Sequence, residues 1–152
     1  AVAGQVCGVR DLTVVNRSRT RRIIAEKLGA AALPSLPEEK RFDKVVEAAG
    51  SPATLQMALQ AVRANGQILA VSVFEEDCMI DANLLVGSQI TLTGCNCYDR
   101  EDLETAVSLL SSGRLDAGPV ITDVVTLDEG KAAFEKLCAK DKSAAKILFR
   151  IG

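Results

Sequence analysis

Four arginines stand within six residues, directly after a short β-branched stretch: residues 12–22 read LTVVNRSRTRR. The β-branched residues favour a strand over residues 12–15, and Asn16 then breaks the pattern. Guanidinium groups form charge-assisted and often bidentate hydrogen bonds with phosphate and carboxylate groups. The stretch therefore predicts a strand tip that meets an anion.

The overall composition limits the class of protein to which such a tip belongs. The chain has 152 residues, 48% hydrophobic and 25% charged, as is ordinary for a soluble globular domain. Its 18 basic and 20 acidic residues leave a net charge of −2, which offers no general surface for nucleic acid or an anionic membrane. We find no signal peptide and no apolar run near the roughly 20 residues of a spanning helix. Five scattered cysteines favour a reducing compartment, so we expect a cytoplasmic protein.

The residue types also restrict the chemistry. Histidine is absent, which removes the commonest general base and the commonest zinc ligand. Cys95 and Cys97 lack a second pair of ligands and fall short of a four-ligand zinc site. On the strand expected there they would share one face, as two small buried packing residues. We therefore predict that the 152 residues of this chain contain no catalytic residue and no metal ligand.

Strands and helices alternate along the sequence. We expect a helix end over residues 1–8, strands over 12–15, 42–49, 67–74, 89–98, 121–126 and 146–151, and helices over 21–28, 53–64, 100–112 and 128–139. A short apolar piece over residues 31–33 is broken by Pro34 and Pro37. Ser18 or Thr20 can cap the first complete helix, and Gly29 can end it. Strands that are apolar on both faces are typical of a parallel sheet covered on both sides, which binds ligands at the carboxyl ends of its strands.

Four stretches of the sequence resemble the cofactor-binding half of the medium-chain, zinc-type alcohol dehydrogenases, most closely the sorbitol and threonine dehydrogenase branch. They read VVNRSRTRRIIAEKLGA, FDKVVEAAGSPATLQMALQAVRANGQILAV, DANLLVGSQITLTGCNCYDREDLETAVSLLSSGRLD and VITDVVTLDEGKAAFEKL. The resemblance implies an α/β fold with a Rossmann-like doubly wound parallel sheet. That sheet is expected to be incomplete, because the first βα unit and its glycine-rich turn precede residue 1 in the family.

The resemblance also implies how the chain is divided into domains. Residues 1–112 correspond to a truncated dinucleotide-binding domain. Residues 113–152 correspond to a C-terminal helix–strand segment that returns toward a missing catalytic domain. Family members with zinc take its ligands from that other domain, so zinc is expected only there.

The same resemblance assigns a role to the arginine-rich tip. Asn16 and Arg17 match the pair that discriminates at the adenosine ribose, and Arg21 matches a basic residue near it. A carboxylate at the first of these positions binds both ribose hydroxyls of NAD but repels a 2′-phosphate. A neutral asparagine followed by arginines therefore favours NADP over NAD as the cofactor. We expect Arg19 and Arg22 only to solvate the start of the helix.

Other residues acquire roles only through the resemblance, and each has a simpler structural reading. The valines would otherwise be strand core, the cysteines packing residues, and the lysine a solvated side chain. The implied contacts are Ala48, Ala49 and Ser51 at the adenine side, Val71 and Val73 at the nicotinamide and its ribose, Cys95 and Cys97 beside the carboxamide, and Lys146 at the pyrophosphate.

Three functions remain open at this stage. The first is the cofactor-binding portion of an NAD(P)-dependent dehydrogenase or reductase, which transfers hydride between a nicotinamide and an alcohol, polyol or ketone. It would be an enzyme in a longer protein and inactive as this chain alone. The second is a catalytically inactive fragment that serves as a folding or dimerisation module. The third is a doubly wound domain for another adenosine ligand, such as S-adenosylmethionine.

One segment predicts an interaction between copies of the chain. Residues 78–86, CMIDANLLV, match the segment that pairs two subunits edge to edge in dimeric relatives. A homodimer through these residues is therefore expected. The other interpretation is an internal loop packed on its own domain.

Overall fold

The structure is a computed structural model that describes residues 1–39, 41–139 and 144–151. It contains two compact units, one formed by Ala1–Ser35 with Glu101–Gly152 and the other by Leu36–Arg100. The predicted domain division at residue 112 concerns the organisation of a longer protein, and it stays a prediction.

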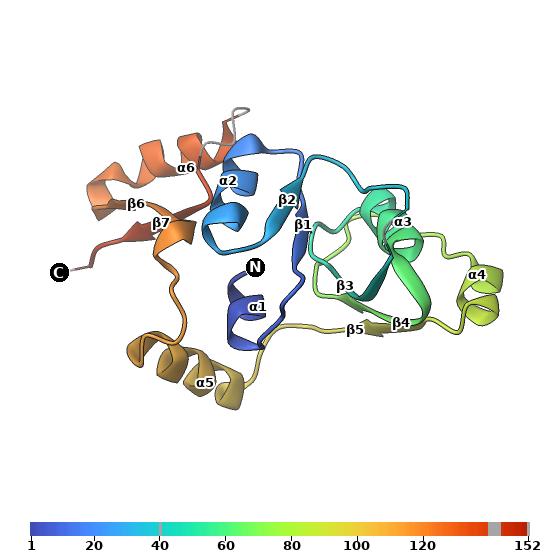
Figure 1. Ribbon diagram of the computed structural model, residues 1–152. Helices are drawn as coiled ribbons and strands as arrows, with labels where there is room; N and C mark the ends of the chain where they lie inside the picture. The colour runs from blue at the N-terminus through green and yellow to red at the C-terminus, as the bar shows by residue number, and fades with distance from the viewer. Residues whose placement is uncertain (40, 140–143, 152) are drawn as a thin grey trace. The chain divides into compact units, whose positions relative to one another are not determined.

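The first unit begins with a strand–helix–strand arrangement that carries the arginine-rich tip. Its elements are α1 (Val2–Val6), β1 (Thr13–Val15), α2 (Arg19–Lys27) and β2 (Ala31–Leu33) (Figure 1). β1 and β2 pair in parallel, and α2 packs against both. Ser18 caps α2 as the sequence predicts, and Gly29 follows it with a φ of +79°, a conformation that glycine adopts without strain.

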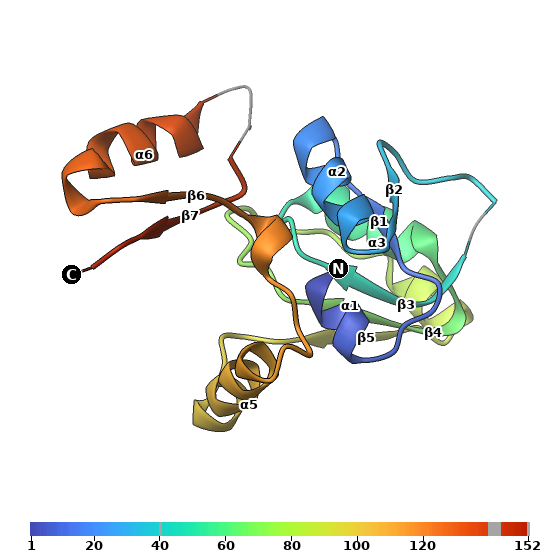
Figure 2. The same ribbon diagram turned by 60° about the vertical axis from the view of Figure 1, so that its left-hand side comes forward.

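The rest of the first unit contains the predicted return segment. Its elements are α5 (Arg100–Ser111), the short 3₁₀ turns η1 (Gly118–Val120) and η2 (Leu127–Glu129), β6 (Ile121–Val125), α6 (Gly130–Cys138) and β7 (Lys146–Phe149). β6 and β7 pair in parallel, and Figures 1 and 2 show α6 alongside this pair. An ion pair between Lys136 of α6 and Asp123 of β6, at 2.5 Å, joins the helix to the strands.

The second unit is a three-stranded parallel sheet with helices packed on it. Its elements are β3 (Phe42–Glu47), α3 (Pro52–Ala61), β4 (Val62–Ala70), α4 (Ala82–Gly87) and β5 (Thr91–Gly94). The strand order is β3–β4–β5 (Figure 1). The buried core consists of Ala58, Leu59, Val62 and Ile68, with Val45, Leu84, Leu85, Ile90 and Leu92 packed around it.

The strand pairings agree with the predicted doubly wound fold. The described strands pair as β1–β2, β3–β4–β5 and β6–β7, and every pairing is parallel. The predicted α/β class with parallel pairing is thus confirmed.

Several element boundaries in the second unit differ from the prediction. α3 ends at Ala61 rather than at residue 64, because Val62 takes an extended conformation and joins the buried core. The strand predicted to reach residue 74 ends at Ala70, opposite Glu47, where its partner β3 also ends. The strand predicted over residues 89–98 is confined to β5, whose pairing with β4 stops at Gly94.

The two faces of the sheet in the second unit differ in burial. Ile68, on the face covered by α3, is 1% exposed, whereas Val46 is 61% and Leu69 38% exposed. Adjacent side chains along a strand point to opposite faces, so one face is covered and the other is open.

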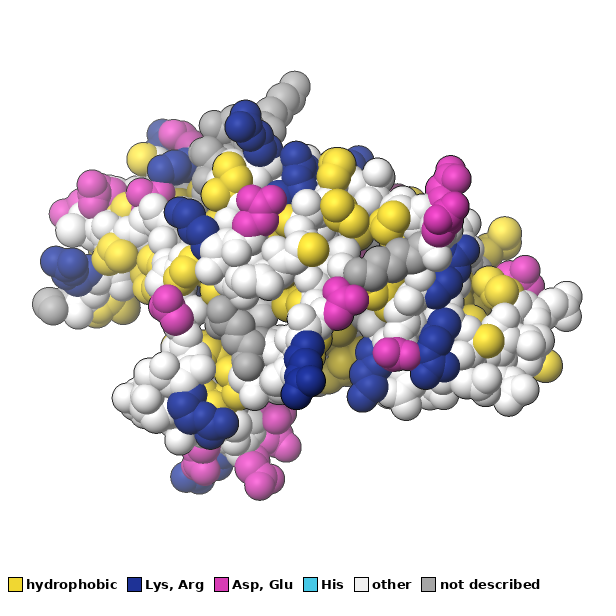
Figure 3. All heavy atoms as spheres, in the orientation of Figure 1, with side chains coloured by type: hydrophobic (Ala, Val, Ile, Leu, Met, Phe, Trp, Pro, Cys, Tyr) yellow, Lys and Arg dark blue, Asp and Glu magenta, His cyan; other side chains and the backbone are white. Residues whose placement is uncertain are grey.

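The surface of the chain carries both charges. On the face that Figure 3 shows, Lys and Arg side chains are interspersed with Asp and Glu side chains. Within the described residues, none of the helices has the length and apolar character needed to cross a membrane.

The core assignment gives a stability prediction. Ile68→Ala is expected to lower the free energy of unfolding by about 2–5 kcal/mol, and Ile68→Val by about 0.5–1.5 kcal/mol, because the lost methyl groups leave a cavity. Urea denaturation followed by circular dichroism measures both. Val73→Ala, at a side chain that is 83% exposed, is the control, and an equal effect of Ile68→Ala and Val73→Ala would contradict this core.

Candidate functional site

The tip of β1 is built by the polar side chain that ends the strand. The backbone N–H of Asn16 donates to Leu33 O at 2.9 Å and closes the pairing with β2. The Asn16 Oδ1 accepts the N–H of Ser18 at 2.9 Å, while the Ser18 hydroxyl accepts the N–H of Arg21 at 3.4 Å. The oxygen of the Asn16 amide is therefore used inside the turn, and its NH₂ group is the part that this turn leaves for a ligand.

One arginine of this tip has a role that the sequence did not reveal. The Nη1 of Arg22 donates to Asn16 O at 2.7 Å and to Arg17 O at 2.9 Å. The expectation that Arg22 merely solvates the helix start is therefore wrong, because its guanidinium fixes the two carbonyl groups of the turn. Arg17, Arg19 and Arg21 are exposed.

In the second unit, parallel pairing brings three strand tips to one edge. The N–H of Val71 donates to Glu47 O at 3.0 Å, and the N–H of Cys95 donates to Ala70 O at 2.9 Å. These bonds extend the pairing by one residue beyond β4 and β5. The structure thus groups at one edge of the sheet the predicted residues that directly follow these strands: Ala48, Ala49 and Ser51 after β3, Val71 and Val73 after β4, and Cys95 and Cys97 after β5.

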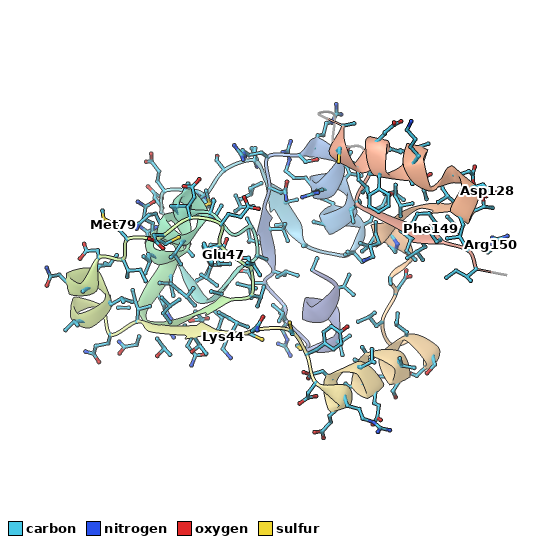
Figure 4. All side chains as sticks on the ribbon, turned by 180° about the vertical axis from the view of Figure 1, so that it is seen from behind. Lys44, Glu47, Met79, Asp128, Phe149 and Arg150 are labelled. Carbon is cyan, nitrogen blue, oxygen red and sulfur yellow. The ribbon has the colours of Figure 1, made fainter. Side chains whose placement is uncertain are left out.

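Glu47, the last residue of β3, holds two of these tips together. Its side chain is 3% exposed, and its Oε1 accepts the N–H groups of Ala49 at 2.9 Å and Gly50 at 3.0 Å. Its Oε2 accepts a short hydrogen bond from the Ser72 hydroxyl. Figure 4 labels Glu47 within this unit. The sequence analysis missed it, and the available signal was a carboxylate that follows Val45 and Val46 at the end of the strand, directly before an Ala-Ala-Gly-Ser turn.

The hydrogen bonds keep this carboxyl group ionised at neutral pH. Burial alone would raise its pKa, but hydrogen bonds from the side chains of Ser72 and Thr54 and from the backbone of Ala49 and Gly50 outweigh burial. The pKa of Glu47 is therefore held below its ordinary value of 4.5.

The turn that follows Glu47 is closed by a capping box. The Ser51 hydroxyl accepts the N–H of Thr54 at 3.3 Å, and the Thr54 Oγ1 accepts the N–H of Ser51 at 3.1 Å. Pro52 follows in the first turn of α3. Ser51 is half-buried, whereas Ala48 and Ala49 are exposed.

The residues that follow β4 and β5 are exposed, although the sequence also allowed them to be strand core or buried packing residues. Val71 and Val73 follow the end of β4 and are 42% and 83% exposed, so the reading as strand core is wrong. Cys95 and Cys97 are also exposed, and Cys97 has a φ of +57°. The expectation of two buried cysteines on one face of a strand is therefore wrong, because regular pairing ends at Gly94.

Lys146 lies in the other unit, as the first residue of β7. Its carbonyl oxygen accepts the Thr122 hydroxyl at 3.0 Å, and its side chain is exposed. The structure therefore groups the predicted site residues in two sets: Asn16, Arg17, Arg21 and Lys146 in the first unit, and the strand-tip residues in the second.

Two surface grooves stand out on the described residues of the second unit, and neither includes a predicted site residue. The larger, of about 550 Å³, is lined by Leu36, Pro37, Glu38, Arg41, Ala53, Gln56, Met57 and Gln60. The smaller, of about 370 Å³, runs past Arg63 and Ile90. Because parallel sheets bind ligands at the carboxyl ends of their strands, we place the candidate site at the strand tips rather than in these grooves.

The described residues do not fit a zinc site. Among them, no group of three or more His, Cys, Asp or Glu side chains could hold a metal ion. No step below is routed through zinc.

The sequence model of the zinc-binding dehydrogenase family matches residues 2–112. The chain therefore belongs to the zinc-binding dehydrogenase family, which confirms the predicted resemblance. The chain is 28% identical over 157 aligned residues to (R,R)-butanediol dehydrogenase of Bacillus subtilis strain 168, and the match covers 96% of this chain and 45% of that protein. The chain thus spans somewhat less than half the length of this relative.

Solved structures agree with this assignment. The crystal structure of 2R,3R-butanediol dehydrogenase from Bacillus subtilis has a TM-score of 0.85 at 27% identity, over 99% of this chain and 46% of that chain. An alcohol dehydrogenase from Escherichia coli CFT073 complexed with NADH has a TM-score of 0.86 at 17% identity, over 99% and 47%. A zinc-binding dehydrogenase from Sinorhizobium meliloti 1021 bound to NADP has 0.83 at 19% identity, over 97% and 48%. The last two likenesses show the fold alone.

The bonds of Arg22 give a prediction for the tip of β1. Arg22→Ala is expected to lower the free energy of unfolding by about 1 kcal/mol, because two hydrogen bonds from a charged donor are lost at a partly exposed site. Arg19→Ala removes the same charge from the same helix and should change it by less than about 0.5 kcal/mol. Urea denaturation of both variants measures the difference. Equal losses would contradict the role of Arg22.

Proposed function

We propose that this chain is the cofactor-binding portion of an NAD(P)-dependent dehydrogenase or reductase. The complete protein would transfer hydride between the nicotinamide and an alcohol, polyol or ketone. The observation that carries the proposal is the family match over residues 2–112, which includes all the predicted strand tips. In such enzymes the cofactor supplies the chemistry, and the protein supplies binding, orientation and electrostatics.

The tip of β1 supports NADP as the preferred cofactor. The oxygen of the Asn16 amide is already occupied by the Ser18 N–H, so the remaining NH₂ group would donate to a ligand. A donor suits a 2′-phosphate, and Asn16 adds no negative charge that would repel one. The exposed guanidinium groups of Arg17 and Arg21 are then available to pair with that phosphate.

The other strand tips would receive the remaining parts of the cofactor. Within the proposal, Ala48, Ala49 and Ser51 lie at the adenine side, and Val71 and Val73 offer exposed apolar contact to the nicotinamide and its ribose. The backbone at Cys95 and Cys97 would lie beside the carboxamide. Lys146 would reach the pyrophosphate, and residues 113–152 would lead back to a separate catalytic domain in the cytoplasmic enzyme.

The competing functions have less support. The inactive folding or dimerisation module is disfavoured because residues 2–112 match the cofactor-binding region of the family. A domain for another adenosine ligand rests on fold analogy alone, and none of the similar proteins above points to it.

A homodimer through residues 78–86 forms part of the proposal. Met79, labelled in Figure 4, is 87% exposed, and Val86 is 78% exposed. The same segment is anchored from within, because Gln56 Nε2 donates to Met79 O at 2.6 Å and Leu84 and Leu85 pack on the core. The segment therefore presents a fixed apolar surface to a second copy.

Cofactor titration tests the proposed function. The full chain is titrated with NADPH and with NADH, and reduced-nicotinamide fluorescence is followed. We expect saturable binding that prefers NADPH. Arg17→Ala and Arg21→Ala should each weaken NADPH binding about tenfold, since each removes a charge-assisted hydrogen bond.

Two matched variants sharpen the titration. Arg19→Ala changes the same charge on the same helix and should leave the affinity for NADPH unchanged. Asn16→Asp keeps an oxygen that can accept the Ser18 N–H but adds a carboxylate, so it should reverse the preference toward NADH. No binding of either cofactor by the folded chain would refute the proposed function. An unchanged cofactor preference in Asn16→Asp would refute the proposed role of Asn16 in favouring NADP over NAD.

A further inference from the structure

Glu47 is a buried residue whose carboxylate accepts hydrogen bonds from uncharged groups. The groups that the structure places on its carboxylate are the N–H groups of Ala49 and Gly50 and the hydroxyls of Ser72 and Thr54. A buried ionised carboxylate is costly unless hydrogen bonds satisfy it. These bonds join residues that are 25 positions apart, on two different strand tips.

A close backbone approach reinforces the same junction. Gly50 has a φ of +73°, and a Cβ atom placed on it would clash with the carbonyl oxygen of Val73. The turn after β3 thus touches the segment after β4 directly, in a conformation that favours glycine. The N–H of Val71, which donates to Glu47 O, adds a backbone link between the two segments.

We propose that Glu47 is a positioning residue of the cofactor site. Its carboxylate holds the Ala49–Gly50 turn against the segment that follows β4, so that both segments present one fixed wall to the nucleotide. The inference rests on the proposed function, because these segments carry the residues proposed to contact the cofactor. Glu47 itself is buried and acts only through its neighbours.

The arrangement also determines which part of the nucleotide this wall can accept. The turn lies at the N-terminal end of α3, where backbone N–H groups commonly bind phosphate. Here the N–H groups of Ala49 and Gly50 are occupied by Glu47, and that of Ser51 by Thr54. The ionised carboxylate of Glu47 already occupies the position at which these N–H groups could bind a phosphate. The wall therefore receives an uncharged part of the cofactor, and the phosphates bind elsewhere.

Variants at two positions separate geometry from charge. Glu47→Gln keeps an oxygen for the two N–H groups and places its amide where Ser72 can accept, so cofactor affinity should stay within about threefold of wild type. Glu47→Asp keeps the charge but is one methylene shorter, and Glu47→Ala keeps neither charge nor reach. Both should weaken NADPH binding about tenfold. Ser72→Ala cuts only the link to the segment after β4 and should weaken binding several-fold.

The measurement is the reduced-nicotinamide titration of the full chain, carried out on variants whose circular dichroism shows the wild-type fold. Glu129→Ala is the matched control, because Glu129 accepts the N–H and hydroxyl of Thr126 in the other unit and lies outside the proposed site. It should leave the affinity unchanged. Formate added to Glu47→Ala should restore part of the binding by replacing the carboxylate, an effect that a general loss of stability would not show.

The outcomes distinguish this inference from the proposed function. Wild-type affinity in Ser72→Ala and in Glu47→Asp, with both folded, overturns the positioning role and leaves the proposed function intact. Should Glu47→Ala fail to fold, Ser72→Ala and Glu47→Asp decide the question. A wild-type chain that binds neither cofactor overturns the proposed function and the inference together.

Discussion

The carboxylate of Glu47 is the interaction on which the candidate site of the second unit depends. Parallel pairing brings the ends of β3 and β4 to the same edge of the sheet, but pairing ends at Glu47 and Ala70. One further backbone bond, from the Val71 N–H to Glu47 O, extends the pairing. Beyond it, the hydrogen bonds that the Glu47 carboxylate accepts from Ala49, Gly50 and Ser72 hold the two tips together. The exposed Val73 directly follows this bonded segment.

The tip of β1 is also held by hydrogen bonds of a charged side chain, but here the side chain is cationic and donates them. There a cationic side chain, Arg22, donates to the carbonyl groups of Asn16 and Arg17, while the Asn16 side chain accepts from Ser18. In both units, polar side chains close to the strand end form hydrogen bonds with backbone groups. The neighbouring residues, such as Arg17 and Val73, are exposed. This division between internal and external groups is what a site on parallel strands requires.

Much of the fold could be predicted from local sequence, and the exceptions are long-range. β-Branched residues gave the position of β1, and the caps at Ser18 and Ser51 follow from short-range hydrogen bonding. By contrast, the ends of β4 and β5 depend on where a partner strand stops. The exposure of Cys95 and Cys97 follows from that limit. Glu47 and Arg22 were missed because their side chains bind backbone groups of a nearby turn, and because the Ser72 partner of Glu47 lies 25 residues away.

The most direct test of the account is an amide ¹⁵N–¹H spectrum of the full chain titrated with NADPH. If the strand tips form the site, saturable shifts will appear at Ala49, Ser51 and Val73 in one unit and at Asn16 and Arg17 in the other. The amides around Met57 and Gln60, in the larger groove of the second unit, will remain unchanged. Saturable shifts confined to that groove, with none at the strand tips, would contradict the account.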